Sequence, residues 1–270
     1  MNTIDTSRVR AIDASALSNG GTPRKLAVVP AYNEERSVGR VVRAIAREAP
    51  DFDVVVIDDG STDRTVAEAE AAGATVIRHP FNLGIGGAMQ SGFQYAMRGG
   101  YQVAAQVDGD GQHDPAYLAK LCTALGADEG VDMVCGTRFL EGAGYRVPLR
   151  RRLGMLVFST FLSMIMRQRV TDPTSGFRVT NRRGIELFAR DYPHDYPEVE
   201  AILMTHAHRL RFAEVPVRMS EREAGSSSIR RGASLYYMIK VTLAVFVGLF
   251  RARPMIDPGD DSPVTAQRGI

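Results

Sequence analysis

Two acidic residues on one short turn are the first candidates for chemistry in this 270-residue sequence. Asp108 and Asp110 follow the apolar run Gln102–Val107, which is typical of a buried strand, and Gln112 comes two residues later. Both carboxylates can reach one cation, and the Gln112 side chain can add a neutral oxygen. Such ligands suit Mg²⁺ or Mn²⁺, which complete their coordination shells with phosphate oxygens. The turn therefore indicates a site for a metal and a diphosphate, although an acidic turn without a ligand has the same pattern.

A second acidic pair, Asp58 and Asp59, follows the apolar run Phe52–Ile57. In a parallel α/β sheet, ligands bind beyond the carboxyl ends of the strands. Both acidic pairs are expected at such ends, which favours a function for them over a role in turn structure alone.

The segment Asn82–Gly87 is a glycine-rich turn that leads into a helix. Its backbone N–H groups could bind a phosphate, or its glycines could serve a tight turn and close helix packing. The pattern is not G-x-G-x-x-G and follows the third predicted strand, which argues against a dinucleotide-binding dehydrogenase. Tyr32 could stack on a base or could be an ordinary surface tyrosine.

Predicted strands and helices alternate along the chain. Apolar runs predict strands at Lys25–Pro30, Phe52–Ile57, Ala74–Arg78, Gln102–Val107, Val131–Cys135 and Arg211–Met219. Helical spacing and N-cap signals predict helices after Asn33, after Ser61 or Thr62, from the glycine-rich turn to about Arg98, after Asp114-Pro115, and over Glu198–His208. The alternation predicts an α/β fold whose sheet is mostly parallel and has helices on both faces.

Composition excludes several classes of protein. Hydrophobic residues make up 44% of the chain and charged residues 24%, which excludes a disordered, collagen-like or polytopic membrane protein. A net charge of +2 is too small for a dedicated nucleic-acid binder. The two cysteines form no CxxC pair, so we expect no disulfide framework or zinc site and a reducing compartment. Residues 1–24 lack the apolar core of a secretory signal and are interpreted as a flexible leader.

The chain after Arg138 has a different character. Six arginines and no acidic residue lie between Arg146 and Arg169, and they flank the uncharged stretch Leu153–Met166. This stretch is too short to span a bilayer as a helix. We interpret residues 148–168 and 231–251 as interface helices on an anionic membrane surface, with packing helices as the alternative, and residues 252–270 as a disordered tail.

Six motifs occurring in order carry a family resemblance. They are PAYNE at Pro30–Glu34, VVVIDDGSTD at Val54–Asp63, NLGIGGA at Asn82–Ala88, DGDGQHDP at Asp108–Pro115, GTRF at Gly136–Phe139 and DPTSGFR at Asp172–Arg178. With them the chain resembles family 2 glycosyltransferases of the GT-A fold, in the branch of dolichyl- or polyprenyl-phosphate mannose or glucose synthases. The resemblance covers about Lys25 to Leu249, with the catalytic domain expected over residues 25–230.

The resemblance implies an inverting, metal-dependent hexosyltransferase that uses a GDP- or UDP-linked sugar. Asp108, Asp110 and Gln112 would hold Mg²⁺ or Mn²⁺. The residues that it assigns to the nucleotide sugar are Pro30, Tyr32, Asn33, Glu34, Asp58, Asp59, Asn82, Gly84, Asp108, Gly109 and Asp110. The candidates for a role in catalysis are Asp172, Arg138, Arg178, Glu198 and Arg222, with Arg151, Arg152 and Glu200 as further alternatives.

The nature of the acceptor decides whether the enzyme needs a base. A lipid phosphate is already anionic at neutral pH and needs cationic positioning, whereas a hydroxyl needs a general base. We expect a polyprenyl-phosphate acceptor and an enzyme bound peripherally to the cytoplasmic face of the membrane. The alternatives are transfer to a hydroxyl of a glycan or small molecule, and a non-catalytic subunit that binds nucleotide sugars. The intact acidic motifs argue against the last.

Overall fold

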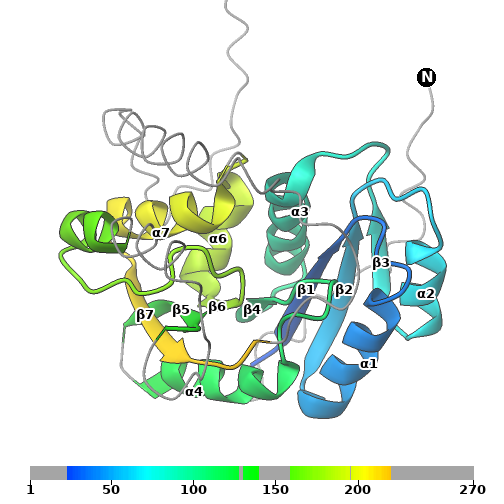
Figure 1. The fold of residues 1–270 in the computed structure, drawn as a ribbon, viewed down its shortest axis with the longest axis horizontal. Helices are drawn as coiled ribbons and strands as arrows, with labels where there is room; N and C mark the ends of the chain where they lie inside the picture. The colour runs from blue at the N-terminus through cyan, green and yellow to red at the C-terminus, as the bar shows by residue number, and fades with distance from the viewer. Residues whose placement is uncertain (1–22, 128–129, 140–158, 195, 220–270) are drawn as a thin grey trace, which may run out of the picture.

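One mixed sheet forms the centre of the fold. The computed structural model describes residues 23–127, 130–139, 159–194 and 196–219. Across these residues the strand order is β3-β2-β1-β4-β6-β5-β7 (Figure 1). The strands are β1 Lys25–Ala31, β2 Phe52–Asp58, β3 Thr75–Arg78, β4 Val103–Gln106, β5 Val131–Thr137, β6 Arg178–Asn181 and β7 Arg211–Pro216.

The prediction of a mostly parallel sheet is confirmed, with one exception. Strands β3, β2, β1 and β4 are parallel to one another, and β5 is parallel to β7. Strand β6 lies antiparallel between β4 and β5. Direct pairing of β1 with both β2 and β4 creates a point where the strand order reverses, and α/β sheets commonly bind ligands at such a point.

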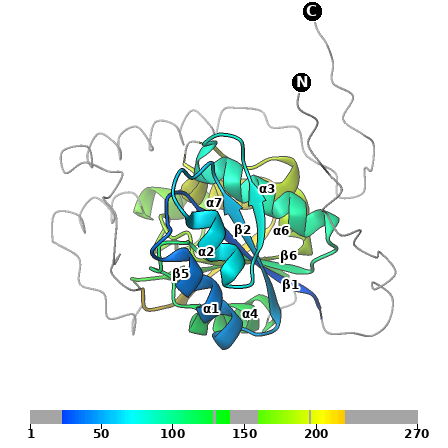
Figure 2. The same ribbon diagram turned by 90° about the vertical axis from the view of Figure 1, so that its right-hand side faces the viewer.

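Helices cover both faces of this sheet and produce two apolar cores (Figure 1 and Figure 2). Residues of α3, α6 and α7 share one core with Val28 of β1, while residues of α1 and α4 share the other with Val29. Adjacent residues of β1 therefore face opposite layers, as the period of a strand requires. The helices are α1 Val38–Glu48, α2 Thr65–Ala71, α3 Gly84–Arg98, α4 Leu118–Ala127, α6 Arg182–Arg190 and α7 Pro197–Ala207.

The helix starts were predicted less well than the strands. Asn33 was expected to cap α1, but Ser37 precedes that helix and Asn33 adopts a left-handed backbone with φ 54°. Arg64, not Ser61 or Thr62, precedes α2. Asp114 does cap as predicted, since its side chain accepts the N–H of Ala116, with Pro115 at the first helical position.

The segment expected to contact a membrane is described only in its last part. Residues 159–166 are helical, and Leu162 and Met166 belong to the core that contains residues of α3, α6 and α7. Met164 is 67% exposed. The described part of this helix therefore packs against the domain through one face. The first part of the expected interface helix 148–168 and the whole of the expected helix 231–251 lie outside the described residues. So do the expected tail from residue 252 and the leader up to residue 22. No helix of the described ranges is long and apolar enough to cross a membrane.

Candidate active site

The two acidic pairs lie on either side of the carboxyl end of β1. Ala31 is in register with Asp58 and accepts the N–H of Asp59 at 2.9 Å. On the other side, Pro30 accepts the N–H of Gly109 at 3.3 Å. The reversal of strand order thus brings both predicted motifs to one edge of the sheet, because the loops after β2 and β4 both turn around the end of β1.

The segment after β1 is bound to the loop after β2 by backbone and side-chain hydrogen bonds. The N–H of Asn33 donates to Ser61 Oγ at 2.9 Å, and the N–H of Thr62 donates to Asn33 Oδ1 at 2.9 Å. The N–H of Glu34 donates to Thr65 Oγ1 at 2.8 Å. The PAYNE and DGSTD motifs therefore form one folded unit. Tyr32 projects from it and is 48% exposed, which leaves the ring accessible.

Asp58 and Asp59 have different surroundings although both are buried. Asp59 accepts the N–H groups of Leu83 and Gly84 at 2.9 and 2.8 Å, and its Oδ1 lies 2.8 Å from His79 Nδ1. The fully buried Asp58 has an Oδ2 atom with no hydrogen-bond partner in the described ranges, although Arg78 Nε lies 3.3 Å from it. Asp59 thus holds the start of α3, and Asp58 retains an acceptor.

The glycine-rich turn uses its N–H groups within the protein. Gly84 N–H donates both to Asp59 and to Asn82 Oδ1, the latter at 2.9 Å. A Cβ atom at Gly86 would lie 2.3 Å from the carbonyl oxygen of Pro193, so this glycine permits close packing of α3. The geometry supports the packing interpretation at Gly86, and phosphate binding by other N–H groups of the turn stays a prediction.

The turn after β4 presents the two carboxylates of Asp108 and Asp110. Asp108 Oδ1 accepts a hydrogen bond from Gln106 Nε2 at 3.0 Å, and the side chain is 26% exposed. Asp110 Oδ1 accepts the N–H of Gln112 at 2.9 Å, which folds the turn back on itself. No group of three or more His, Cys, Asp or Glu side chains suited to a metal occurs in the described part of the chain. Two carboxylates and an amide fit an ion whose remaining ligands come from water and substrate phosphates, as is usual for Mg²⁺.

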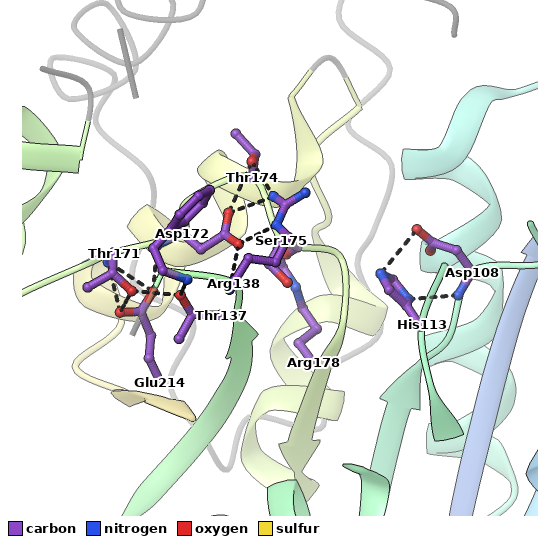
Figure 3. Close-up of polar contacts among 11 residues, drawn as sticks. Asp108, His113, Thr137, Arg138, Thr171, Asp172, Thr174, Ser175, Arg178 and Glu214 are labelled. Carbon is purple, nitrogen blue, oxygen red and sulfur yellow. Dashed lines mark hydrogen bonds and ion pairs between the residues drawn. The ribbon is translucent and has the colours of Figure 1, made fainter. Parts of the chain in front are cut away.

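A second polar cluster lies at the end of β5 (Figure 3). The guanidinium of Arg138 donates to both oxygens of Asp172, from Nε at 2.7 Å and from Nη2 at 2.8 Å. The backbone N–H of Arg138 also donates to this carboxylate at 3.2 Å. Asp172 is fully buried, and the Arg138 side chain is 16% exposed. This bidentate pair leaves Asp172 compensated in charge and fixed in orientation.

Glu214 of β7 supports the turn that carries Asp172. Its carboxylate accepts the N–H of Asp172 at 2.9 Å and both the N–H and the hydroxyl of Thr171, each at 2.8 Å. Burial raises the pKa of the Glu214 carboxyl, and these hydrogen bonds oppose the rise. Glu214 was not predicted from the sequence, because the contact joins positions more than 40 residues apart.

Arg178 begins β6 and is almost completely buried. Its Nη2 donates to the carbonyl oxygens of Ser175 and Glu198, while Nε and Nη1 have no hydrogen-bond partner in the described ranges. Burial raises the pKa of the Glu198 carboxyl, and the charge of Arg178 opposes that rise. Arg178 was a candidate for binding a lipid phosphate, but at 2% exposure its position is internal.

The structure therefore brings together most of the predicted residues, in two groups. Pro30, Tyr32, Asn33, Glu34, Asp58, Asp59, Asn82, Gly84, Asp108, Gly109, Asp110 and Gln112 lie around the end of β1. Arg138 and Asp172 lie beyond the end of β5, with Arg178 and Glu198 between the groups. Arg151, Arg152 and Arg222 lie outside the described residues. Sequence reasoning missed Gln106 and His113, both of which contact Asp108.

Comparison with known proteins identifies the family. The model of the family described as "Glycosyl transferase family 2" matches residues 26–188. One curated relative is a polyprenol monophosphomannose synthase of Mycolicibacterium smegmatis, which is 29% identical over 82% of this chain and 86% of that protein. Another is an undecaprenyl-phosphate mannosyltransferase of Micrococcus luteus, which is 30% identical over 81% of this chain and 93% of that protein.

Comparison of structures supports the same assignment at the level of fold. The glucosyl-3-phosphoglycerate synthase of Mycobacterium tuberculosis, solved with Mn²⁺, uridine diphosphate and phosphoglyceric acid, superimposes with a TM-score of 0.65. It is 23% identical, and the match covers 86% of this chain and 80% of that one. The predicted GT-A fold is confirmed, and the protein belongs to glycosyl transferase family 2.

Proposed function

We propose that this enzyme transfers a sugar from a nucleotide-diphosphate sugar to a polyprenyl phosphate, with inversion at the anomeric carbon. The names of the curated relatives support an acceptor of this class. The observation that carries the proposal is the state of Asp172, whose two oxygens are both engaged by Arg138. A carboxylate held in this way is poorly placed to take a proton from a hydroxyl, and an acceptor that is already anionic needs no such step.

On the donor side, Asp108, Asp110 and Gln112 would hold Mg²⁺ or Mn²⁺ together with the diphosphate. The bound ion would supply Lewis-acid stabilisation of the leaving nucleoside diphosphate. The exposed ring of Tyr32 would stack on the base of the nucleoside. Asp58 Oδ2, which accepts no hydrogen bond in the described ranges, would accept an N–H of the base. Both uracil and guanine offer such an N–H, so GDP and UDP donors both fit this arrangement.

On the acceptor side, Arg138 would orient the lipid phosphate. Its side chain retains 16% exposure while Asp172 fixes its plane, and a guanidinium matches the geometry of a phosphate. We place the enzyme peripherally on the cytoplasmic face of the membrane. Met164, exposed on the helix over 159–166, would contribute to that contact.

A hydroxyl acceptor is the second candidate function, and Glu198 is the feature that favours it. This largely buried carboxyl of α7 lies near Arg178 and has a raised pKa, which is a property of general bases. Under this alternative, the Glu198→Gln variant would lose about 10²- to 10⁴-fold in turnover. Under the phosphate-acceptor proposal, the variant keeps most of its rate.

The deciding experiment is a panel of nucleotide sugars assayed with Mn²⁺, with and without a short polyprenyl phosphate. Lipid-linked radioactivity that depends on the polyprenyl phosphate is the expected result. A pH–rate profile of wild type and Asp172→Asn then identifies the titrating group. An acidic limb near pH ~6 that persists in the variant fits the acceptor phosphate. Loss of that limb with a thousandfold fall in rate would make Asp172 the base and overturn the proposal.

A further inference from the structure

His113 contacts Asp108, the first acidic residue of the proposed metal site, at two points (Figure 3). Its Nδ1 atom lies 3.0 Å from the backbone nitrogen of Asp108, and its Nε2 atom lies 3.6 Å from Asp108 Oδ2. The backbone N–H of Asp108 can only donate, so Nδ1 accepts and the ring hydrogen is on Nε2. The imidazole therefore presents an acceptor to the main chain and a donor edge to the carboxylate of the same residue.

This geometry argues against His113 as a metal ligand. A ligating imidazole needs a free lone pair, and the lone pair of Nδ1 is directed at the N–H of Asp108. The side chain is 5% exposed, and its ring stacks on Phe177 with centroids 4.9 Å apart and planes 16° apart. The ring is thus fixed by packing from one side and by hydrogen bonding from another.

Two further contacts complete the support of Asp108. Gln106 donates to Oδ1, and the backbone of Gly176 lies against the carboxylate. A Cβ atom at Gly176 would lie 3.3 Å from Asp108 Oδ2 and 2.8 Å from Gln106 Nε2, so a side chain there would displace this arrangement. Asp108 is consequently confined to one orientation while remaining partly open to solvent.

The backbone of His113 also connects two parts of the proposed site. It forms an isolated antiparallel bridge with Met219, three residues before Arg222 in the sequence. The metal turn and the chain that leads to the serine-rich segment are therefore tied together at His113.

We propose that His113 is a positioning residue that sets the orientation of Asp108 for the divalent cation and the donor diphosphate. The inference rests on the proposed function of the turn. Groups that hydrogen-bond to metal-ligating carboxylates commonly change metal affinity or activity about 10- to 100-fold when removed. His113 contacts both the main chain and the side chain of Asp108, so its loss removes one constraint on each, while Gln106 still donates to Oδ1.

Electron paramagnetic resonance of Mn²⁺ provides a test that does not depend on turnover. The free-ion signal is titrated with the full chain in the presence of UDP and, separately, of GDP. His113→Phe keeps the ring stacked on Phe177 and removes both nitrogen contacts, and we expect Mn²⁺ affinity to fall about 10- to 100-fold. Phe177→Leu is the matched control, since it weakens the stacking but leaves both nitrogen atoms, and we expect a change below about 3-fold.

The outcomes separate this inference from the proposed function. A wild-type chain that binds no Mn²⁺ with either nucleotide overturns the metal site and the inference with it. A wild-type chain that binds, together with equal affinity in His113→Phe, overturns the inference alone. So does an equal loss in Phe177→Leu, because packing would then explain the effect.

A second pair of variants keeps the inference testable if His113→Phe does not fold. His113→Asn and His113→Leu have side chains of similar shape, but only Asn offers an acceptor near the position of Nδ1. We expect His113→Asn to bind Mn²⁺ several-fold more tightly than His113→Leu. Equal affinities in this pair would contradict the role of the hydrogen bond to Asp108.

Discussion

Asp108 and Asp172 lie at the same edge of the sheet but have contrasting partners. The amide of Gln106 and the imidazole of His113 contact Asp108, which also interacts electrostatically with the buried Arg178. Asp172 instead faces the full positive charge of Arg138 through two short hydrogen bonds. Neutral donors orient a carboxylate without cancelling its charge, whereas a bidentate guanidinium does both. The contrast teaches that charge compensation, more than residue type or motif, separates a carboxylate available to a cation from one committed to the protein.

The largest expected effect concerns the acidic turn after β4. Asp110→Ala removes one of the two carboxylates of the turn, and the lost stabilisation of the leaving group, about 4 kcal/mol, lowers transfer about 10³-fold. Radiolabel transfer at saturating donor measures it. Asp114→Asn is the matched control in the same loop, because an Asn side chain can still accept the N–H of Ala116. Full activity of Asp110→Ala in excess chelator would contradict metal dependence.

The second largest effect concerns the buried ion pair of Arg138 and Asp172. Arg138→Ala leaves the fully buried Asp172 without its cation, and breaking a buried pair in this way costs about 3–5 kcal/mol of unfolding free energy. Urea unfolding measures the loss. Adding Asp172→Asn removes the unpaired charge and should restore at least about 1 kcal/mol. A double variant no more stable than Arg138→Ala would show that charge burial is not the cause.

A third comparison sharpens the role of the helix over 159–166. Leu162 is fully buried and Met164 is exposed on the same helix. Leu162→Ser should cost about 2–5 kcal/mol of stability, as large-to-small core changes do. Met164→Ser should change stability by less than about 0.5 kcal/mol and weaken co-sedimentation with anionic liposomes. Unchanged liposome binding in Met164→Ser would remove this residue from the membrane contact.

The smallest effect concerns an ion pair at the amino-terminal end of β1, opposite the end that carries the proposed site. Lys25 Nζ lies 2.6 Å from Asp51 Oδ2, and this hydrogen bond lowers the pKa of Asp51 and raises that of Lys25. The stabilisation is therefore lost as pH falls below about 3.8 or rises above about 10.5. Asp51→Asn should cost about 0–1 kcal/mol at neutral pH and nothing at pH ~2. Thermal melts at both values test this, and a cost that persists in acid would exclude the ion pair.

The half of the fold built from β1 to β4 was predictable from local patterns. Apolar runs such as Lys25–Pro30 are buried on both faces and stand out in the sequence. The acidic residues that follow them could be placed at one edge because parallel strands point the same way. The residues that precede α1 and α2 could not be predicted in this way, because Asn33 and the Ser61–Thr62 segment form hydrogen bonds with each other and not with a helix start.

The other half depends on contacts that no local pattern contains. Strand β6 has only four residues, Arg178–Asn181, and its antiparallel direction has no signature in so short a run. Helix α6 was missed although Ile185 and Phe188 recur at helical spacing and Asn181 caps it by accepting the N–H of Gly184. The pairing of Arg138 with Asp172 and the support from Glu214 join distant parts of the chain. Motif order indicated that Arg138 and Asp172 matter, but not that they bind each other.

The antiparallel pairing of β6 with β5 has a consequence for where the chain can accept insertions. Cys135 of β5 is in register with Arg178 of β6, and Gly136 donates its N–H to the carbonyl oxygen of Phe177. Forty-two residues separate Cys135 from Arg178 in the sequence. The described part of this segment is bound into the domain, because Leu162 and Val170 lie in the core and Glu214 accepts hydrogen bonds from Thr171 and Asp172. The entropic cost of closing a loop rises only slowly with its length. We therefore expect insertions between β5 and β6 to be tolerated where they leave these contacts in place.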